Sequence, residues 1–364
     1  MLGFFMWGAD PTAFTLLSRE VRWYGILFAL SFICAQYILT KIYKDENVDV
    51  KLLDKFAIYA VLGTVLGARL GHCLFYEPEH YLSNPLDILK IWEGGLASHG
   101  ATLGLLISTY LFYRKYKVKS YAWTLDMLAI VVALAGFFVR TGNFFNSEII
   151  GKPTTANVGV VFYNRSFSYL EEHLAQGDFL QGDIDVSRTN QDLIMNEKMV
   201  YAPLKASLEV SSAYNDQTIK DTIRYTLFNF FDNRLNQGDQ MVIYPKDLTI
   251  SVVQKGTKKI ANFEVLGIPR HPTQLYEAFT SLVLFILMIA LYKPNRFQHG
   301  FFVGLFFIWT FGLRFVHEFF KENQVAKEED MFLNLGQLLS IPLVLAGIYL
   351  MARALINQKK NREV

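Results

Sequence analysis

The chain has 364 residues, of which 52% are hydrophobic, 15% aromatic and 19% charged. This composition is too apolar for an ordinary soluble domain. Its 35 basic and 33 acidic residues leave a net charge of +2, so there is no surplus of positive charge to hold a nucleic-acid backbone. The two cysteines, Cys34 and Cys73, lie in apolar runs and form neither a metal-ligand spacing nor a disulfide framework.

Seven stretches carry the roughly 20 mostly apolar residues that a helix needs to cross the hydrocarbon core of a bilayer. In chain order they are 23–40, 56–76, 96–113, 121–139, 274–292, 301–319 and 332–355. The sequence therefore predicts an all-α polytopic membrane protein with seven transmembrane helices. Residues 1–17 lack a basic n-region and a small-residue cleavage site, so they are interpreted as an interfacial segment rather than a removable signal peptide.

The basic residues of the short loops predict the orientation, because cytoplasmic loops carry an excess of lysine and arginine. Basic residues follow the first, third, fifth and seventh stretches: Lys41, Lys44, Lys51, Lys55, Arg114, Lys115, Lys117, Lys119, Lys293, Arg296, Arg353, Lys359, Lys360 and Arg362. The loops on the other side hold only Lys90, Lys321 and Lys327. We therefore expect the N-terminus outside and the C-terminus in the cytoplasm.

A polar segment, 152–270, separates the fourth apolar stretch from the fifth and is long enough for a small domain. It has helical apolar spacing at 218–231 and four short β-rich runs, at 158–163, 241–244, 248–254 and 263–266. We expect a small α+β extracytoplasmic domain here, inserted between membrane segments 1–151 and 271–364. The segment has no cysteine, histidine cluster or glycine-rich phosphate loop, so the chemistry is expected in the membrane domain.

Four groups of ionisable and amide residues lie at or near the expected outer ends of the spans. Charge is costly in hydrocarbon, so such residues face the bundle interior, a water-filled cavity or one another. The first group, 93–104, reads EGGLASHGATLG and contains His99 among glycines that allow close backbone approach. His99 is interpreted as a base or a phosphate ligand, and helix packing by small residues is the alternative.

The second group, 140–151, reads RTGNFFNSEIIG and leaves the fourth stretch. On a continuing helix Arg140 and Asn143 share a face, and Asn146 and Glu148 follow near the water boundary. An arginine fork with amide donors suits a phosphate oxyanion. The alternative is an arginine that snorkels to the lipid headgroups.

The third group, 270–278, reads RHPTQLYEA and begins the fifth stretch. Pro272 suits the first turn of a helix, on which Gln274 and Glu277 share a face. The alternative is a polar helix start with an interfacial tyrosine.

The fourth group, 314–320, reads RFVHEFF at the end of the sixth stretch. Arg314 and Glu318 are four residues apart, with His317 beside them, and a structural intramembrane ion pair is the alternative to a functional site. Four polar groups from different spans at one depth predict an anion-binding cavity open to the outer leaflet. No spacing in the sequence indicates a metal site.

These motifs resemble the signature blocks of the prolipoprotein diacylglyceryl transferase family. The resemblance is carried by RTGNFFNSE, RHPTQLYEA, SHG, RWYG at 22–25, GARLG at 67–71 and GQLLSIPLVLAG at 336–347. It covers all seven stretches in the family's order but not the long insert. The chain departs from the family pattern at Ala101, where a second glycine is usual, and after Glu318, where Lys321, Glu322 and Asn323 replace an arginine and a proline-aspartate pair.

The resemblance implies an integral enzyme of the bacterial inner membrane. Such an enzyme transfers the sn-1,2-diacylglyceryl group of phosphatidylglycerol to the thiol of the lipobox cysteine of a prolipoprotein, giving a thioether and glycerol 1-phosphate. Its partners are the phospholipid, the lipobox peptide and the bilayer, with no nucleic acid, no cofactor and no metal. The functional positions of the family map to Tyr24, His99, Arg140, Asn143, Glu148, Gly151, Tyr276, Glu277, Arg314 and Glu318, with His271 and Gln274 in support.

The chemistry requires a thiol of pKa about 8.5 to become a thiolate, and it requires the charge of the departing phosphate to be held. The expected catalytic set is His99, Arg140, Glu148, Glu277, Arg314 and Glu318. The expected phosphatidylglycerol-binding set is Tyr24, Arg140, Asn143, Gly151, His271, Gln274, Tyr276 and Arg314. His99 is the preferred group for thiol deprotonation or for steering the leaving group, while the glutamates position the arginines or share in proton transfer.

Three other classes of protein are weighed against this interpretation. A lipid-dependent transferase with another acceptor would use the same kind of bundle. A transporter is disfavoured because the sequence has no convincing internal repeat and no matched pair of interrupted helices. A non-catalytic scaffold would tolerate loss of Arg140 and His99.

Overall fold

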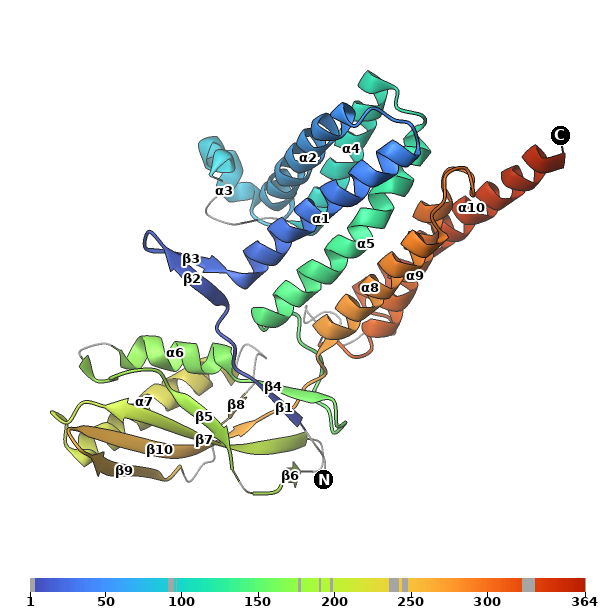
Figure 1. Ribbon diagram of the computed structural model, residues 1–364. Helices are drawn as coiled ribbons and strands as arrows, with labels where there is room; N and C mark the ends of the chain where they lie inside the picture. Colours follow the sequence, from blue (N-terminus) through green and yellow to red (C-terminus); the bar gives the residue numbers. More distant parts are fainter. Residues whose placement is uncertain are drawn as a thin grey trace. The chain divides into compact units, whose positions relative to one another are not determined.

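The computed structural model describes residues 4–90, 95, 97–175, 178–189, 191–196, 199–235, 242–243, 248–322 and 331–363. The described chain is mostly helical, with additional β-sheet (Figure 1). It divides into two compact units, each with its own hydrophobic core. The sheet unit comprises Met1–Ile26, Arg140–Tyr276 and His317–Met331; the helix unit comprises Leu27–Val139, Glu277–Val316 and Phe332–Val364.

Every predicted apolar stretch falls on a helix in the part of the chain that the structure describes. Five helices are long and apolar enough to cross a membrane: α1 (Trp23–Asp45), α2 (Lys51–Phe75), α5 (Tyr121–Phe145), α8 (Thr273–Leu291) and α10 (Leu335–Glu363). The other two stretches correspond to α4 (Ser98–Tyr116) and to α9 (Phe301–His317), an apolar helix of 17 residues. The polytopic membrane character is therefore supported, while the number of spans stays a prediction. Residue 96, the predicted start of the third stretch, lies outside the described residues.

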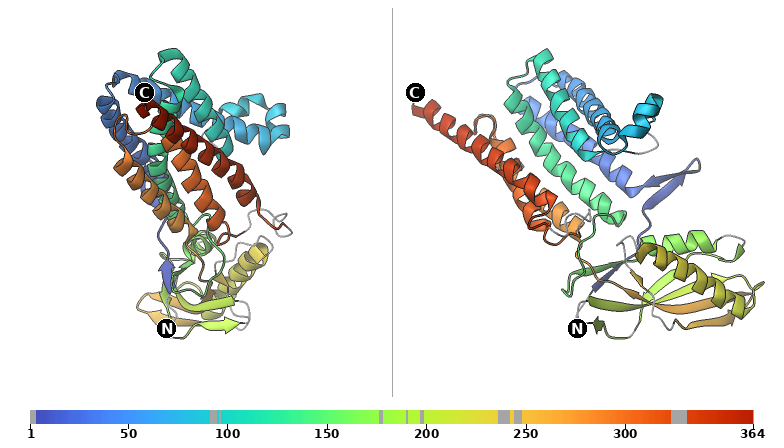
Figure 2. Two further views of the ribbon diagram at one scale, coloured as in Figure 1. Left: turned by 90° about the vertical axis from the view of Figure 1, so that its right-hand side faces the viewer. Right: turned by 180° about the vertical axis from the view of Figure 1, so that it is seen from behind.

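Helices α2 and α4 lie side by side (Figures 1 and 2). Glycines allow their backbones to approach closely. A Cβ added to Gly67 would lie 2.4 Å from the carbonyl oxygen of Gly100, and one added to Gly104 would lie 2.1 Å from that of Gly63. Any side chain at these positions would collide with the facing backbone. Two short elements that the sequence did not predict, α3 (Pro78–Ser83) and the 3-10 helix η1 (Pro85–Leu89), connect α2 to α4.

The start of α9 is fixed by a carboxylate from another helix. Asp126 of α5 is buried and accepts the backbone N–H groups of Gly300 at 2.6 Å and Val303 at 2.8 Å. Both N–H groups belong to the first turn of α9 or its cap, where a helix lacks internal acceptors. Asp126 therefore acts as the cap of a helix far away in sequence.

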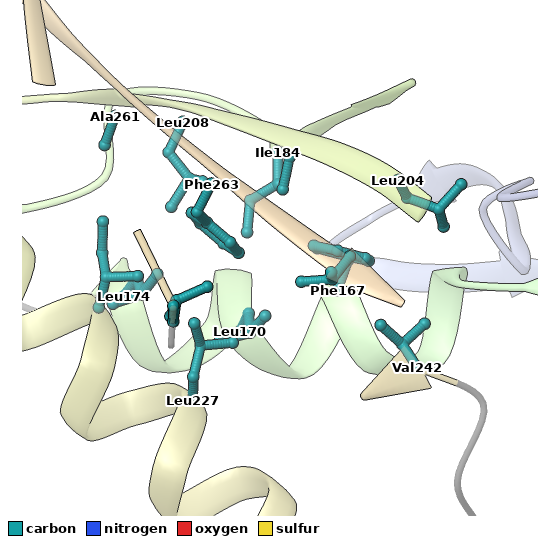
Figure 3. Close-up of a cluster of buried hydrophobic side chains, with 14 of the residues drawn as sticks. Phe167, Leu170, Leu174, Ile184, Leu204, Leu208, Leu227, Val242, Ala261 and Phe263 are labelled. Atoms are coloured by element: carbon teal, nitrogen blue, oxygen red, sulfur yellow. The ribbon is translucent and has the colours of Figure 1, made fainter. Parts of the chain in front are cut away.

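The largest sheet is antiparallel, in the order β5 (Asp185–Arg188), β7 (Met199–Val210), β10 (Lys258–Gly267) and β8 (Val242–Ile243). Two further strands, β6 (Ile194–Asn196) and β9 (Ile250–Lys255), pair with β7 and β10. Side chains of β7 alternate between buried and accessible, as a sheet covered on one face requires. Helices α6 (Asn164–Leu174) and α7 (Asp216–Leu235) contribute Leu170, Leu174 and Leu227 to the core beneath the sheet (Figure 3).

The predicted runs 158–163, 248–254 and 263–266 coincide with β4 (Gly159–Phe162), β9 and β10, and the predicted helix 218–231 lies within α7. Of the run 241–244, only 242 and 243 lie within the described residues, and they form β8. The prediction missed β5, β6, β7 and α6. The α+β character expected of this segment is thus observed, with more strands than the sequence indicated.

Residues 4–22 form three strands that the sequence did not predict, and the interfacial interpretation of residues 1–17 stays a prediction. Strand β1 (Phe4–Trp7) pairs in parallel with β4, so that Phe4 lies opposite Gly159. Strands β2 (Thr12–Leu16) and β3 (Arg19–Arg22) form an antiparallel hairpin directly before α1. The N-terminal strand is therefore part of the sheet unit.

Candidate active site

Glu148 is the centre of a polar cluster just beyond the C-terminal end of α5. Asn143 Nδ2 donates to Glu148 Oε2 at 3.1 Å, and Asn146 Nδ2 donates to Glu148 Oε1 at 3.3 Å. The chain turns back here through Ser147 and Ile149, whose φ angles are 50° and 54°. This left-handed turn brings the carboxylate back to the helix end from which the amides project.

Arg140 extends the cluster by one helical turn. Its Nη1 donates to Asn143 Oδ1 at 3.4 Å, a long bond that continues the chain of contacts to Glu148. Tyr24, in the first turn of α1, lies against Gly142, where an added Cβ would come within 2.8 Å of Tyr24 Cδ2. Glycine at 142 therefore lets the tyrosine lie directly on this end of α5.

Gly151 lies where three segments of the sheet unit meet. Its N–H donates to the carbonyl oxygen of His271 at 2.9 Å, and its own carbonyl accepts Arg270 Nη1 at 3.3 Å. It also forms an isolated antiparallel bridge with Lys321. A Cβ at Gly151 would lie 2.6 Å from His271 Cβ and from the carbonyl oxygen of Phe320. Only glycine fits this junction without displacing a neighbour.

The first turn of α8 is tied to the residues that follow α5. Gln274 is fully buried, and its Nε2 donates to the carbonyl oxygen of Glu148. Thr273 Oγ1 donates to the carbonyl oxygen of Ile149 at 2.7 Å. These bonds hold the third predicted group against the second.

His271 precedes α8 and forms a hydrogen bond between its Nδ1 and the hydroxyl of Tyr276 at 3.1 Å. Its ring also lies edge-on to Phe320, with centroids 5.1 Å apart. Burial lowers the pKa of His271, because the charged imidazolium would lose solvation. The neutral ring is therefore favoured at neutral pH.

Two ion pairs of the sheet unit lie at and just after the end of the fourth group. Lys321 Nζ lies 3.4 Å from Glu318 Oε1; the lysine is buried and the side chain of the glutamate is largely so. Arg270 pairs with Glu322. Lys321 therefore supplies a cation beside Glu318 at the point where the sequence departs from the family pattern.

The structure assigns the predicted site residues to both units. The sheet unit contains Tyr24, Arg140, Asn143, Glu148, Gly151, His271, Gln274, Tyr276 and Glu318. The helix unit contains His99, Glu277 and Arg314. His99 is exposed in the first turn of α4, and Glu277 is buried in α8. The meeting of all four groups in one cavity therefore stays a prediction, and residues 93, 94 and 96 of the histidine motif lie outside the described residues.

Several residues that support the cluster were missed at the sequence level. Ser147 Oγ donates to Asn164 Oδ1 at 2.6 Å, and Asn164 Nδ2 donates to the carbonyl of Ala9 at 3.0 Å. Trp7 Nε1 donates to the carbonyl of Phe144 at 3.0 Å. Partners so far apart in sequence leave no local spacing signal. Within the described ranges, no group of three or more His, Cys, Asp or Glu residues could hold a metal ion.

The long apolar helices, with polar residues bonded to one another at the ends of α5 and α8, define a polytopic membrane protein. Residues 11–353 match the profile described as prolipoprotein diacylglyceryl transferase. The chain belongs to this family.

Curated relatives match along nearly their whole length. The phosphatidylglycerol–prolipoprotein diacylglyceryl transferase of Tolumonas auensis is 35% identical over 346 residues, which is 95% of each chain. The protein of the same name from Porphyromonas gingivalis is 34% identical over 362 residues, covering 97% of this chain and 96% of the relative. That of Chloroherpeton thalassium is 31% identical over 349 residues, covering 95% and 93%.

Proposed function

We propose that the cluster of Arg140, Asn143 and Glu148 binds the phosphate of phosphatidylglycerol during diacylglyceryl transfer. The reaction itself follows from the family: the chain is a transferase that moves the diacylglyceryl group from phosphatidylglycerol to prolipoprotein. The observation that carries the site proposal is the chain of hydrogen bonds from Arg140 through Asn143 to Glu148. It fixes an arginine fork at the end of a span, where a lipid phosphate lies.

Glu148 acts in this proposal as a positioning group. Because Asn143 Nδ2 is held by the carboxylate, Asn143 Oδ1 faces the other way, toward Arg140. The amide thus orients the guanidinium, and the negative charge nearby helps to keep the arginine from leaving for the headgroup region. Tyr24, Gly151, His271, Gln274 and Tyr276 complete the lipid-binding set.

The chemical step replaces a carbon–oxygen bond with a carbon–sulfur bond. The lipobox cysteine loses its proton, and the thiolate attacks the glyceryl carbon that bears the phosphate. The electron pair of the broken bond leaves with the phosphate as glycerol 1-phosphate. Arg140 and Arg314 hold this charge in surroundings of low dielectric. His99 accepts the thiol proton or steers the leaving group, with Glu277 and Glu318 positioning the arginines or sharing in proton transfer.

Seven spans are proposed, and strand pairing supports the count. Strands β1 and β4 pair, so both lie on one side of the membrane and an even number of crossings separates them. Of the intervening helices, α1, α2 and α5 are the long apolar ones, and an even count favours α4 as the fourth crossing. The bridge between Gly151 and Lys321 supports a crossing by α9 in the same way, because α8 alone would leave an odd number.

The orientation follows from this even count and the loop charges. The N-terminus and the insert 152–270 lie on the extracytoplasmic side, and α10 brings the C-terminus into the cytoplasm. The membrane segments are 1–151 and 271–364. The site then faces the outer leaflet of the bacterial cytoplasmic membrane, where it accepts the lipobox peptide.

The test is transfer of labelled diacylglyceryl from phosphatidylglycerol to a lipobox peptide by the purified protein. We expect transfer by the native chain, none to a peptide with serine in place of the cysteine, and a loss of about 10²- to 10³-fold in Arg140→Ala. Arg140→Lys should be intermediate because it keeps the charge but not the fork. Arg224→Ala, at an exposed position of α7, is the matched control.

The two parts of the proposal fail separately. A folded native chain that transfers nothing from any phospholipid would contradict the reaction. A fully active Arg140→Ala would leave the reaction standing and remove the phosphate site.

A further inference from the structure

An arginine outside the proposed site binds the loop that leads to His99. Arg69 of α2 is only 3% exposed. Its Nε donates to the carbonyl oxygen of Ile88 at 3.0 Å, and its Nη2 donates to that of Asp87 at 2.6 Å. Its Nη1 reaches the carbonyl oxygen of Gly95 at 3.5 Å. Three separate nitrogens of one side chain thus bind carbonyls of η1 and of Gly95, just before α4.

The use of these donors is informative because a buried guanidinium is costly unless its N–H groups are bonded. Arg69 meets this need with the main-chain carbonyls of Asp87 and Ile88 in η1 and of Gly95, two residues before the N-cap of α4. Its guanidinium also lies 5.0 Å from the ring centroid of Tyr81. The side chain therefore holds the backbone directly at these three residues.

The start of α4 depends on α2 for its position. Ala97 is the N-cap of α4 and provides no side-chain hydrogen bond, because its methyl group cannot accept one. Its backbone N–H instead donates to the carbonyl of Ala68, the neighbour of Arg69, at 2.9 Å. The first turn of α4 is thus fixed from outside the helix.

Glycines hold the same loop close to α2. Gly95 has φ +69°, and a Cβ there would lie 2.8 Å from Arg69 Nη1 and 2.5 Å from His72 Cδ2. A Cβ at Gly71 would lie 2.7 Å from the Cα of Gly100, the residue after His99. The backbone on both sides of the helix start is therefore pressed against the part of α2 that carries Arg69.

We propose that Arg69 is a positioning residue for the transfer reaction. It holds the carbonyls of Asp87, Ile88 and Gly95 against α2. The first turn of α4 is thereby fixed, and with it the position of His99. The inference rests on the proposed function, because it requires His99 to act in the reaction. Arg69 itself does not touch the substrate in this role.

The conservative replacement is informative because lysine keeps the charge but has a single nitrogen at its tip. Arg69→Lys can bind one of the three carbonyls well and leaves the loop loosely held. We expect kcat to fall about 10- to 100-fold, as for a misplaced catalytic group, with the KM for phosphatidylglycerol within twofold of the native value. Arg114→Lys, an exposed arginine near the end of α4, should be unchanged.

A double-variant cycle separates positioning from general support. In a His99→Gln background, Arg69→Lys should cause no further loss, because the group that it positions is gone. Losses that multiply in the double variant would overturn the proposal, as would a native kcat in Arg69→Lys.

Hydrogen exchange followed by mass spectrometry tests whether Arg69 positions α4 even if His99→Gln has no measurable activity. Arg69→Lys should speed exchange in the first turn of α4 and leave α5 and α8 as in the native chain. Equal acceleration in all helices would show general destabilisation and overturn the proposal. A native protein without transfer activity would contradict the proposed function, while the exchange result would still report on the loop.

Discussion

The junction around Gly151 and the pair formed by α2 and α4 hold site residues by different means. At the junction, separate segments are joined by hydrogen bonds from Gly151 and Arg270 and by the burial of Lys321. In the helix pair, glycine faces glycine, and backbone lies against backbone. The junction is built from many modest attractions, while the helix pair depends on the absence of side chains.

This difference predicts how each region responds to change. A hydrogen bond contributes a net of about 1 kcal/mol, so each hydrogen bond removed at the junction should lower the stability by a small step. Helices in a bilayer gain little from burying apolar surface against each other, because lipid tails are equally apolar, and their association depends on close packing. Added volume in the helix pair should therefore have the larger effect.

The largest effect is expected for Gly104→Ala in α4. The new Cβ would lie 2.1 Å from the carbonyl oxygen of Gly63, and the facing backbone cannot move without separating the helices. We expect a loss of stability of about 3 kcal/mol, measured by denaturant titration in detergent. Gly312→Ala is the matched control, since no heavy atom outside its own helix backbone and chain neighbours lies within 4 Å of a Cβ there. Equal stabilities of the two variants would contradict the close-packing interpretation.

A smaller effect is expected for Gly151→Ala at the junction. The added Cβ meets His271 and the carbonyl of Phe320 at 2.6 Å, but these belong to irregular segments that can shift. We expect about 2 kcal/mol of destabilisation together with reduced transfer activity. Gly25→Ala, where the Cβ meets nothing within 4 Å, is the control. If Gly151→Ala were more damaging than Gly104→Ala, the comparison would be reversed.

Glu148→Gln sharpens the comparison further, because it should separate activity from stability. A glutamine has one acceptor oxygen, so either Asn143 or Asn146 loses its partner. The Asn143 amide that orients Arg140 is then held less firmly. Stability should fall by about 1 kcal/mol, whereas transfer should fall about tenfold or more. Glu172→Gln, on the exposed side of α6, should alter neither. Parallel losses in melting temperature and activity would assign Glu148 a purely structural role.

A pH effect at His271 should be smaller again. Because burial lowers its pKa in the folded state, the unfolded chain binds the proton more readily. The contribution of His271 is therefore complete above about pH 6.5 and declines as the pH falls through that value. Between about pH 7.5 and 5.5, a range that brackets the ordinary histidine pKa, the melting temperature of the native chain should drop more than that of His271→Gln. Superimposable pH curves would refute this.

The smallest effect is expected at the exposed pair of Lys258 and Glu209 on the sheet. Lys258 lowers the pKa of Glu209, but both side chains are in solvent. Exposed pairs contribute little, because water and salt screen them. Lys258→Ala should leave the melting temperature unchanged. A clear drop would show that this exposed ion pair contributes to stability, against the expectation for a screened surface pair.

The sequence predicted the features that depend on local pattern. Each predicted apolar stretch falls on a helix, and five of these helices are long and apolar enough to cross a membrane, because membrane crossing is a requirement on consecutive residues. The helical spacing of Arg140 and Asn143 also anticipated their contact, since α5 continues to Phe145. The site motifs were recognisable for the same reason: each is a short string of consecutive residues.

Features that depend on distant partners were not predicted. Strand β7 was missed because Pro203 interrupts its pattern and its accessible face is polar, and β1 because four residues reveal no partner. The ion pair of Arg270 with Glu322 and the bond from Asn164 to Ala9 join residues far apart in the chain. Spacing cannot report such contacts, since the fold alone brings the partners together.

The parallel pairing of β1 with β4 also orders events during synthesis. Phe4 lies opposite Gly159, so β1 cannot pair until the ribosome has added a further 155 residues. At about 5–20 residues per second this delay is roughly 8–30 s, during which α1, α2, α4 and α5 are all made. The sheet unit is therefore completed only after α1, α2, α4 and α5 have been synthesised, and the strand made first pairs with one made much later.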